Sequence, residues 1–399
     1  MRPWLPLIIA LAVQLACGAA TENLRSDPAA IEKRGKLELK RAIAAEKKGK
    51  NVAAKRHYLA AVELRPEHFS TREKASRFLR GIGEPKQAVE IVIDFVERAP
   101  GDPRGYHLLA DVQFANGDSQ AAIESLGEII AIDDEDASAF HKRGTVHMNE
   151  GSVEEALSDF RRAAELDDDN AEYQTSLGFA LSRLSKKQSL EEAEQVLRRA
   201  LELDRKNADA NRLLGTVLRK KFDPKGALDY HIRAVELDPD SANAYFELGL
   251  TQNALGQNGE AEESLKESLE LNPNDAVAWY AFGEVLRITK QYARAVPAYE
   301  KALDLDPKNS KAANKLGVCL YQIGDLKKAE LILSAAIQVD SDDPYPYFNL
   351  GMVYNKGKRY HAAIKALKRF IELAPSGDGD IATAKRMIVR LQRKIRSRY

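Results

Sequence analysis

Residues 276–309 read AVAWYAFGEVLRITKQYARAVPAYEKALDLDPKN, and this stretch of 34 residues decides the fold. It carries two small residues, Gly283 and Ala295, at the points where two helices of one unit would cross. Two helices approach closely only where no bulky side chain stands between them. The stretch therefore predicts a helix-turn-helix unit that stacks on copies of itself.

The same pattern recurs along most of the chain. An alanine returns every 34 residues, with one interval of 37, at Ala54, Ala88, Ala122, Ala156, Ala193, Ala227, Ala261, Ala295, Ala329 and Ala363. Counting each unit from Gly35 onward, position 8 is glycine in the last seven units, and position 24 is bulky in nearly every unit. Ten such units predict an all-α rod of stacked helix pairs, whose function lies in a surface more than in a buried catalytic pocket.

The signature of the eighth unit resembles the tetratricopeptide repeat family. The residues that carry the resemblance are Trp279, Phe282, Gly283, Ala295, Tyr299, Ala302 and Pro307. The repeat covers 35–377, most of the chain. The resemblance implies a right-handed α-solenoid, a superhelix of about ten helix-turn-helix units. It also implies that the first helix of each unit lines an inner groove that grips a peptide or a partner helix.

We expect four parts: a signal peptide at 1–16, a tether at 17–34, ten repeat units over 35–377 and a C-terminal capping helix at 378–399. The units are 35–68, 69–102, 103–136, 137–170, 171–207, 208–241, 242–275, 276–309, 310–343 and 344–377. The expected caps of second helices are Asp118, Ser152, Ser189, Asp223 and Asp325, whose side chains can accept from first-turn amides. The last helix has one apolar stripe and an otherwise basic circumference, which either stays solvated or docks on anionic lipid or on an acidic patch of a partner.

The N-terminus predicts export. An apolar run from Leu5 to Val13 follows Arg2, and it is typical of a secretory signal and too short to span a membrane. Cys17 comes directly after the run and resembles the lipobox of bacterial lipoproteins, although Gln14 departs from that motif. This resemblance implies cleavage before Cys17 and a lipid anchor, and Gly18 favours the outer membrane. The alternative is ordinary cleavage after Ala19 or Ala20.

Composition and motifs argue against several functions. Sixty basic residues balance 60 acidic ones, so no surplus of positive charge indicates nucleic-acid binding. His107 and His141 occupy the same position of neighbouring units, but a metal site would need further ligands. No nucleophile motif or phosphate-binding loop is present. We therefore expect neither an enzyme nor a cofactor or metal.

The inner positions of the first helices indicate where a partner binds. Units two to six offer mostly polar and charged residues there. Units seven to ten offer apolar anchors among asparagines, namely Asn243, Phe246, Leu250, Asn253, Tyr280, Asn314, Tyr321, Tyr345, Phe348, Met352 and Asn355. Such a mixture suits an extended peptide, whose side chains fill pockets while amides pair with its backbone.

The leading hypothesis is a non-enzymatic scaffold that binds a protein or peptide partner, exported to the periplasm and lipid-anchored to the outer membrane. Its role would be the assembly of an envelope complex, a step that rests on family analogy. One alternative is a holding chaperone for exported polypeptides. Another is an adaptor of the eukaryotic secretory pathway, against which the absence of any Asn-x-Ser/Thr sequon weighs.

Overall fold

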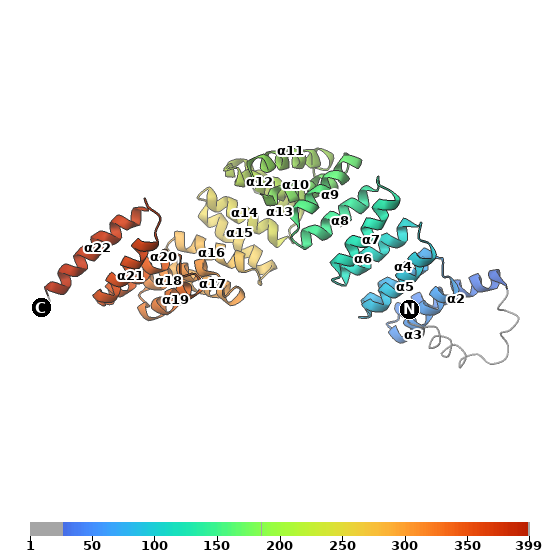
Figure 1. The fold of residues 1–399 in the computed structure, drawn as a ribbon, viewed down its shortest axis with the longest axis horizontal. Coiled ribbons are helices and arrows are strands. Elements are labelled where there is room, and N and C mark those ends of the chain that lie inside the picture. Colours follow the sequence, from blue (N-terminus) through green and yellow to red (C-terminus); the bar gives the residue numbers. More distant parts are fainter. Residues whose placement is uncertain (1–26, 185, 398–399) are drawn as a thin grey trace. The chain divides into compact units, whose positions relative to one another are not determined.

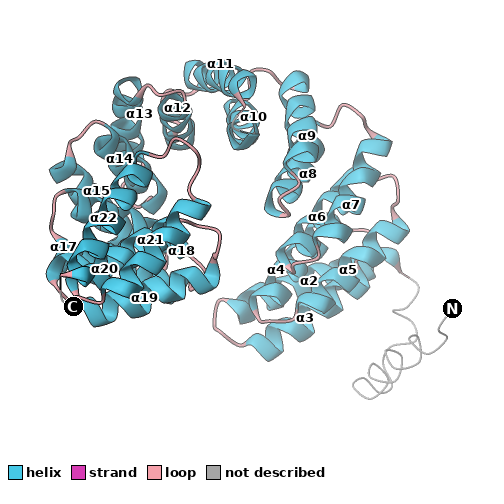
Figure 2. Ribbon diagram, turned by 60° about the vertical axis from the view of Figure 1, so that its left-hand side comes forward, coloured by secondary structure: helices cyan, strands magenta, loops and turns pink. Residues whose placement is uncertain are grey.

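The chain folds into helices joined by short turns. The structure, a computed structural model, describes residues 27–184 and 186–397, and these contain no β-strand (Figure 2). The chain divides into two compact units, residues 1–183 and 184–399. Within each unit, most consecutive helices pack as antiparallel neighbours (Figure 1). The all-α fold predicted from the repeat is therefore confirmed.

The helices of the first unit begin with a long one and continue as alternating first and second helices of the repeats. They are α2 (Pro28–Glu46), α3 (Asn51–Leu64), α4 (Phe69–Gly81), α5 (Pro85–Arg98), α6 (Pro103–Ala115), α7 (Ser119–Ile132), α8 (Ala137–Asn149), α9 (Val153–Leu166) and α10 (Ala171–Leu184), whose last residue opens the second unit.

The second unit continues the alternation and ends with a helix outside the repeats. Its helices are α11 (Lys187–Leu203), α12 (Ala208–Lys220), α13 (Pro224–Leu237), α14 (Ala242–Ala254), α15 (Asn258–Leu271), α16 (Ala276–Ile288), α17 (Tyr292–Leu305), α18 (Ser310–Ile323), α19 (Leu326–Val339), α20 (Tyr345–Lys356), α21 (Tyr360–Leu373) and α22 (Gly379–Arg396).

Acidic and amide side chains start many of these helices. The Asp118 side chain accepts from the Ala121 amide, and Asp136 accepts from that of Ala139, each satisfying a donor that the first turn leaves free. The same cap is made by Asp27, Asp102, Asn207, Asp223, Ser241, Asp275, Asn309, Asp325 and Asp378. The predicted caps Asp118, Asp223 and Asp325 are therefore confirmed.

Small residues let the helices of each pair touch. All ten repeat alanines have no exposed surface. The glycine at position 8 lies under the bulky residue at position 24 of its own unit. A Cβ on Gly317 would stand 2.5 Å from Leu333 Cγ, and one on Gly283 would stand 2.8 Å from Tyr299 Cε1. Both separations are below van der Waals contact, so each glycine makes room for one large side chain.

One of these large side chains is a histidine. His231 of α13 is fully buried, and a Cβ on Gly215 would lie 2.5 Å from its Nε2. Its Nδ1 lies 2.9 Å from Thr251 Oγ1, and its Nε2 lies 3.2 Å from the Arg212 carbonyl oxygen. A neutral ring satisfies both neighbours, because Nε2 donates to the carbonyl and Nδ1 accepts from the hydroxyl. Burial lowers the pKa of His231 to about 4.

A cysteine lies in the core of the second unit. Cys319 of α18 has no exposed surface and packs in a cluster with Leu316, Leu320 and Leu333. Burial raises the pKa of its thiol to about 11. The thiol is therefore neutral and behaves as a small apolar side chain.

Three sequence predictions need correction. The tether was expected to extend to residue 34, but α2 begins at Pro28, because Asp27 caps it and proline suits a first helical position. Ser189 lies inside α11, which begins at Lys187, so it caps nothing; the extra residues of this unit lengthen the helix. Ser152 precedes α9 but makes no capping hydrogen bond. Residues 1–26, with Cys17 and the apolar run, lie outside the described residues.

The C-terminal helix covers the end of the second unit. Its residues Ala384, Ile388 and Leu391 are buried in one cluster with Leu367 and Phe370 of α21. No described helix is both long and apolar enough to cross a lipid bilayer.

Candidate functional site

The second unit contains a cavity of about 580 Å³ along its first helices. We call it the groove cavity. It is lined by Tyr280 of α16, Ser310, Lys311, Asn314, Lys315 and Val318 of α18, Asp340 and Asp343 of the following turn, Tyr345, Phe348 and Asn349 of α20, and Asp380 of α22. The volume falls within the range of about 300–1,000 Å³ that is usual for ligand sites.

Aromatic side chains form the apolar part of this cavity. The Phe348 ring lies 5.0 Å from that of Phe370, which is fully buried, so the core of α21 supports it from behind. Tyr345 is 45% exposed, and its hydroxyl donates to Asp378 Oδ2 at 3.0 Å. This hydrogen bond raises the pKa of Tyr345. Both rings are held in place and leave a face open to the cavity.

A third ring is supported by an ionic network. Tyr280 packs edge-on against Tyr299, at 5.9 Å between centroids. The Tyr299 hydroxyl donates to Glu284, which also accepts from Arg287 at 2.9 and 3.0 Å. Burial alone would raise the pKa of Glu284, but these hydrogen bonds outweigh burial and lower it. The carboxylate therefore stays ionised and fixes the wall behind Tyr280.

Two asparagines form the polar part of the cavity. Asn349 Nδ2 donates to Asn314 Oδ1 at 2.7 Å. This bond leaves Asn314 Nδ2 and Asn349 Oδ1 without a partner among the described residues. One free donor next to one free acceptor is the complement of a peptide group, which offers one C=O and one N–H.

The charged residues of the cavity differ in how they are used. Asp340 accepts from the amides of Asp342 and Asp343, and Asp343 accepts from the Tyr345 amide, so both carboxylates order the turn before α20. Lys311 and Lys315 make no ion pair within the described part of the chain. The two ammonium groups are therefore available to an anionic group of a ligand.

Four of the eleven groove residues predicted from the sequence line this cavity: Tyr280, Asn314, Tyr345 and Phe348. Two others, Phe246 and Leu250, are half-buried and pack on Leu265 of the same unit and on Ala281 and Val285 of the next, so they serve the stacking of repeats. Tyr321 lies under Lys356, whose Nζ is 4.6 Å from the ring centroid. The remaining four, Asn243, Asn253, Met352 and Asn355, lie on α14 and α20 outside the cavity.

Sequence reasoning missed Lys311, Lys315 and Asn349. Lys311 precedes the predicted residue Asn314 by three positions on the same helix and therefore lies on the same side, but only apolar residues and asparagines are predicted there from the sequence. Lys315 and Asn349 stand at the sixth position of their units, directly after the predicted residues Asn314 and Phe348. Their signal was the repeat spacing itself, since Asn349 follows Asn314 by 35 residues and therefore lies beside it on the next first helix.

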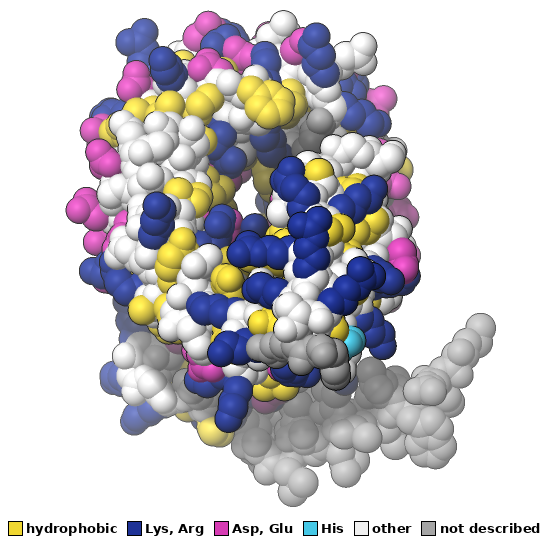
Figure 3. Space-filling model, turned by 90° about the vertical axis from the view of Figure 1, so that its left-hand side faces the viewer, with side chains coloured by type: hydrophobic (Ala, Val, Ile, Leu, Met, Phe, Trp, Pro, Cys, Tyr) yellow, Lys and Arg dark blue, Asp and Glu magenta, His cyan; other side chains and the backbone are white. Residues whose placement is uncertain are grey.

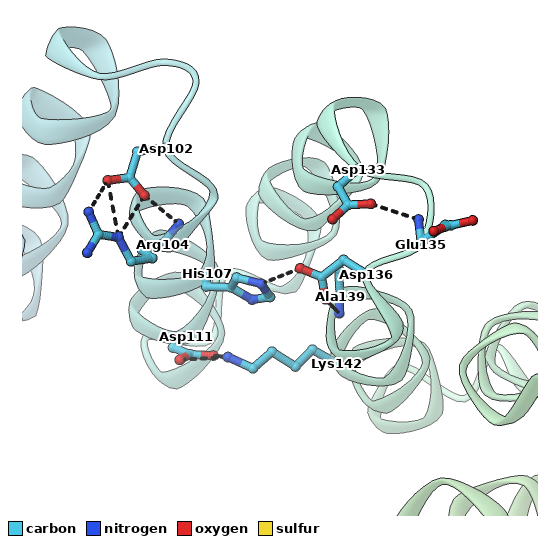
Figure 4. A network of polar contacts seen from close by, with 9 residues as sticks. All are labelled: Asp102, Arg104, His107, Asp111, Asp133, Glu135, Asp136, Ala139 and Lys142. Carbon is cyan, nitrogen blue, oxygen red and sulfur yellow. Dashed lines mark hydrogen bonds and ion pairs between the residues drawn. The ribbon is translucent and has the colours of Figure 1, made fainter. Parts of the chain in front are cut away.

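The first unit has a smaller cavity of about 440 Å³, and two of its charged lining residues, Asp111 and Lys142, pair with each other. Lys142 of α8 donates to both Asp111 carboxylate oxygens, at 2.7 and 2.9 Å (Figure 4). His107 Nε2 lies 2.9 Å from Asp136 Oδ2, and His141 Nε2 lies 2.9 Å from Ser176 Oγ. Burial lowers the pKa of His141. The two histidines thus have separate partners, and no metal-binding group occurs among the described residues.

Comparisons with known proteins agree with the repeat. Models of the tetratricopeptide repeat match residues 107–171, 141–210 and 232–263, and residues 260–381 match the model of the cytochrome c-type biogenesis protein H TPR domain. The chain belongs to the tetratricopeptide repeat family. Because this family binds protein or peptide partners, the chain is a protein-interaction scaffold.

Solved structures of the same fold align with parts of the chain. YrrB, described as a TPR protein with an unusual peptide-binding site, is 23% identical, with 47% of this chain and 97% of that one covered and a TM-score of 0.43. MamA is 26% identical, with 40% and 93% covered and a TM-score of 0.39. MamA from Desulfovibrio magneticus RS-1 is 23% identical, with 43% and 97% covered and a TM-score of 0.41. A comparison with curated proteins found no match.

Proposed function

We propose that the groove cavity holds an extended segment of a partner protein and that the chain is a non-enzymatic scaffold for assembling a complex in the cell envelope. The observation that carries this proposal is the free donor and acceptor of Asn314 and Asn349 next to the open face of Phe348. Amides that pair with a backbone, beside a ring that receives a side chain, are how grooves hold extended peptides.

The cavity also defines the chemistry of the bound segment. Its backbone C=O would accept from Asn314 Nδ2, and its N–H would donate to Asn349 Oδ1. An apolar side chain would pack between Phe348 and Tyr280. A carboxylate of the segment would lie near Lys311 and Lys315, where charge-assisted hydrogen bonds are the stronger kind. The partner segment is therefore extended, apolar at one position and acidic at a neighbouring one.

The envelope location is proposed from the N-terminal sequence. The run from Leu5 to Val13 and the cysteine at position 17 support export and attachment of the chain to the outer membrane by lipid. The match of residues 260–381 to a TPR domain of a cytochrome c-type biogenesis protein supports a role in assembly. Cys17→Ser should release the protein from membranes washed at high salt, which screens ionic binding, and should change the mass of its mature form. A variant that stays bound after this wash with unchanged mass contradicts the anchor.

Site-specific photocrosslinking in native cells tests the groove. A photoreactive residue at Tyr345, which is exposed at the cavity, should give one adduct of defined mass. The matched control is Leu331 of α19, which is 68% exposed and lies on a second helix away from the cavity. The adduct at position 345 should become much weaker when Phe348→Ala is added.

The same experiment separates a scaffold from a holding chaperone. Many adducts of different mass at position 345 would favour a chaperone for exported polypeptides, the client surface being the same apolar wall. Equal adducts at positions 345 and 331 would contradict the groove cavity as the binding site.

A further inference from the structure

The C-terminal end of the chain carries a concentrated positive charge. Residues 356–396 contain twelve lysines and arginines and three acidic residues, a net charge of +9, in a chain whose total is zero. Figure 3, which looks onto this end of the chain, shows dark-blue Lys and Arg side chains gathered on the face turned to the viewer. The charge asymmetry indicates an anionic partner for this end.

Five of these cations share one face of α22. They are Lys385, Arg386, Arg390, Arg393 and Arg396, and all five are exposed. At 100° per residue they fall within an arc of about 140° and extend over about 16 Å of helix. Val389, which is 48% exposed, lies within the same arc. We call this surface the cationic face.

No acidic residue neutralises the cationic face. None of its five cations forms an ion pair among the described residues, and Arg386 only donates to Thr383 Oγ1 at 3.2 Å. Lys394 points elsewhere, with its Nζ 5.4 Å from the Tyr360 ring of α21. The acids of this helix, Asp378 and Asp380, stand at its start, where Asp378 caps the first turn. An anionic ligand that binds this face would therefore reduce the electrostatic repulsion between the five cations.

The opposite face of α22 is already occupied. Ala384, Ile388 and Leu391 are buried against α21, so the helix cannot turn an apolar side into a bilayer while it caps the repeats. Binding through the cationic face is thus electrostatic and shallow, with Val389 as its single exposed apolar side chain. The face is convex, and none of its five cations lines a described cavity.

We propose that the cationic face docks on the surface of a membrane that contains anionic phospholipids. Headgroups in a bilayer can rearrange around each cation of a convex row, whereas a peptide ligand would need a concave site. Each cation near such a surface contributes about a fivefold gain in affinity, equal to about 1 kcal/mol. Docking would hold the second unit, with its groove cavity, against the membrane independently of any lipid on Cys17.

Vesicle flotation tests this proposal on residues 18–399, which retain every described helix and lack both Cys17 and the apolar run. The protein should float with vesicles of phosphatidylcholine and phosphatidylglycerol at low salt, stay behind with phosphatidylcholine alone, and dissociate as salt is raised. The triple variant Arg386→Gln, Arg390→Gln, Arg393→Gln should bind about a hundredfold more weakly. The triple variant Arg386→Lys, Arg390→Lys, Arg393→Lys, which keeps the three positive charges, should retain binding.

A matched control removes three exposed cations elsewhere in the second unit. Lys225→Gln, Lys308→Gln, Lys327→Gln lowers the net charge equally and should leave flotation unchanged. Circular dichroism should show the same thermal midpoint for both triple variants, since none of the six side chains is buried. Equal loss in both triple variants would overturn a dedicated face. Preference for duplex DNA over vesicles at equal phosphate concentration would overturn the proposal and assign the face to nucleic acid. No flotation at low salt would also overturn it and assign the face to an acidic protein.

Discussion

Two charged pairs of the first unit contrast with two lysines of the groove cavity in the second unit. In the first unit, Asp111 is paired with Lys142, and His107 with Asp136. In the second unit, Lys311 and Lys315 have no ion pair among the described residues, and two asparagine atoms are free. A group that is satisfied within the stack must lose its partner before it can bind a ligand, whereas a solvated group loses only water. These first-unit pairs therefore stabilise the stack, whereas the lysines and amides of the groove cavity can bind a ligand without losing a protein partner.

Acidification should have the largest effect, because it lowers the stability of the second unit, which buries a neutral histidine. The pKa of His231 is about 4 when folded and 6.5 otherwise, so the unfolded chain binds more protons between these values. Stability is present above pH 6.5 and falls as the pH drops, by about 3 kcal/mol once both values are passed. Urea unfolding of the wild type and of His231→Leu, at neutral pH and at about pH 4.5, measures the difference.

His231→Leu should flatten this pH dependence, since most units carry an apolar residue at this position. The exposed His361 gives the control, and His361→Leu should leave the pH dependence as in the wild type. A wild-type slope that survives His231→Leu would assign the acid sensitivity to other groups.

Overpacking should have the next largest effect. Gly317→Val places a side chain where a Cβ alone would lie 2.5 Å from Leu333 Cγ, and should cost about 2 kcal/mol. Gly259→Ala is the control, because nothing lies within 4 Å of its Cβ position and alanine favours a helix. Thermal unfolding followed by circular dichroism compares the two. Equal stability of both variants would mean that the second unit is loosely packed, and that its free polar groups reflect this looseness.

Removal of an anchor ring should weaken the partner about tenfold. Phe348→Ala takes one wall from the groove cavity and leaves the helix pair intact. His107→Ala changes the same position of a first-unit repeat and should leave affinity unchanged. Fluorescence anisotropy with the crosslinked partner segment measures both. A loss of affinity on His107→Ala alone would move the binding site to the first unit.

The smallest effect is expected from the paired charges of the first unit. Lys142→Ala should lower stability by about 0.5 kcal/mol, less at high salt, because exposed pairs contribute little. Lys311→Ala should leave stability unchanged and weaken the partner segment in a salt-dependent way. If Lys142→Ala lowered the affinity for the partner segment as much as Lys311→Ala does, the distinction between paired lysines and lysines that bind the ligand would fail.

The repeat made most of the fold predictable. Small residues at two fixed positions and caps such as Asp118 are local signals that recur ten times, and the helices follow them. The prediction failed at Ser189, where inserted residues changed the register, and at residues 28–34, where a proline and an aspartate extended the first helix. Both failures lie at the edges of the repeat, where only one copy of each signal exists.

The site was less predictable, because it depends on contacts between neighbouring repeats. Position along a helix indicated that Tyr280, Asn314, Tyr345 and Phe348 face inward, but it could not distinguish them from Phe246 and Leu250, which pack between repeats. Nor could it show that Asn349 would pair with Asn314 or that Lys142 would pair with Asp111. Pairing depends on the side chain one repeat away, and a positional rule treats each repeat alone.

The buried Cys319 offers a built-in reporter on the second unit. Once residue 17 is removed or replaced, the chain has a single thiol, and it lies on α18, the helix that also presents Asn314 and Lys311 to the groove cavity. Alkylating reagents reach it only when α18 separates from its neighbours, so the labelling rate measures how often that wall opens. A bound segment that spans α18 and α20 should slow alkylation of Cys319. The alkylation rate would then report how much of the groove cavity is occupied, with no added probe.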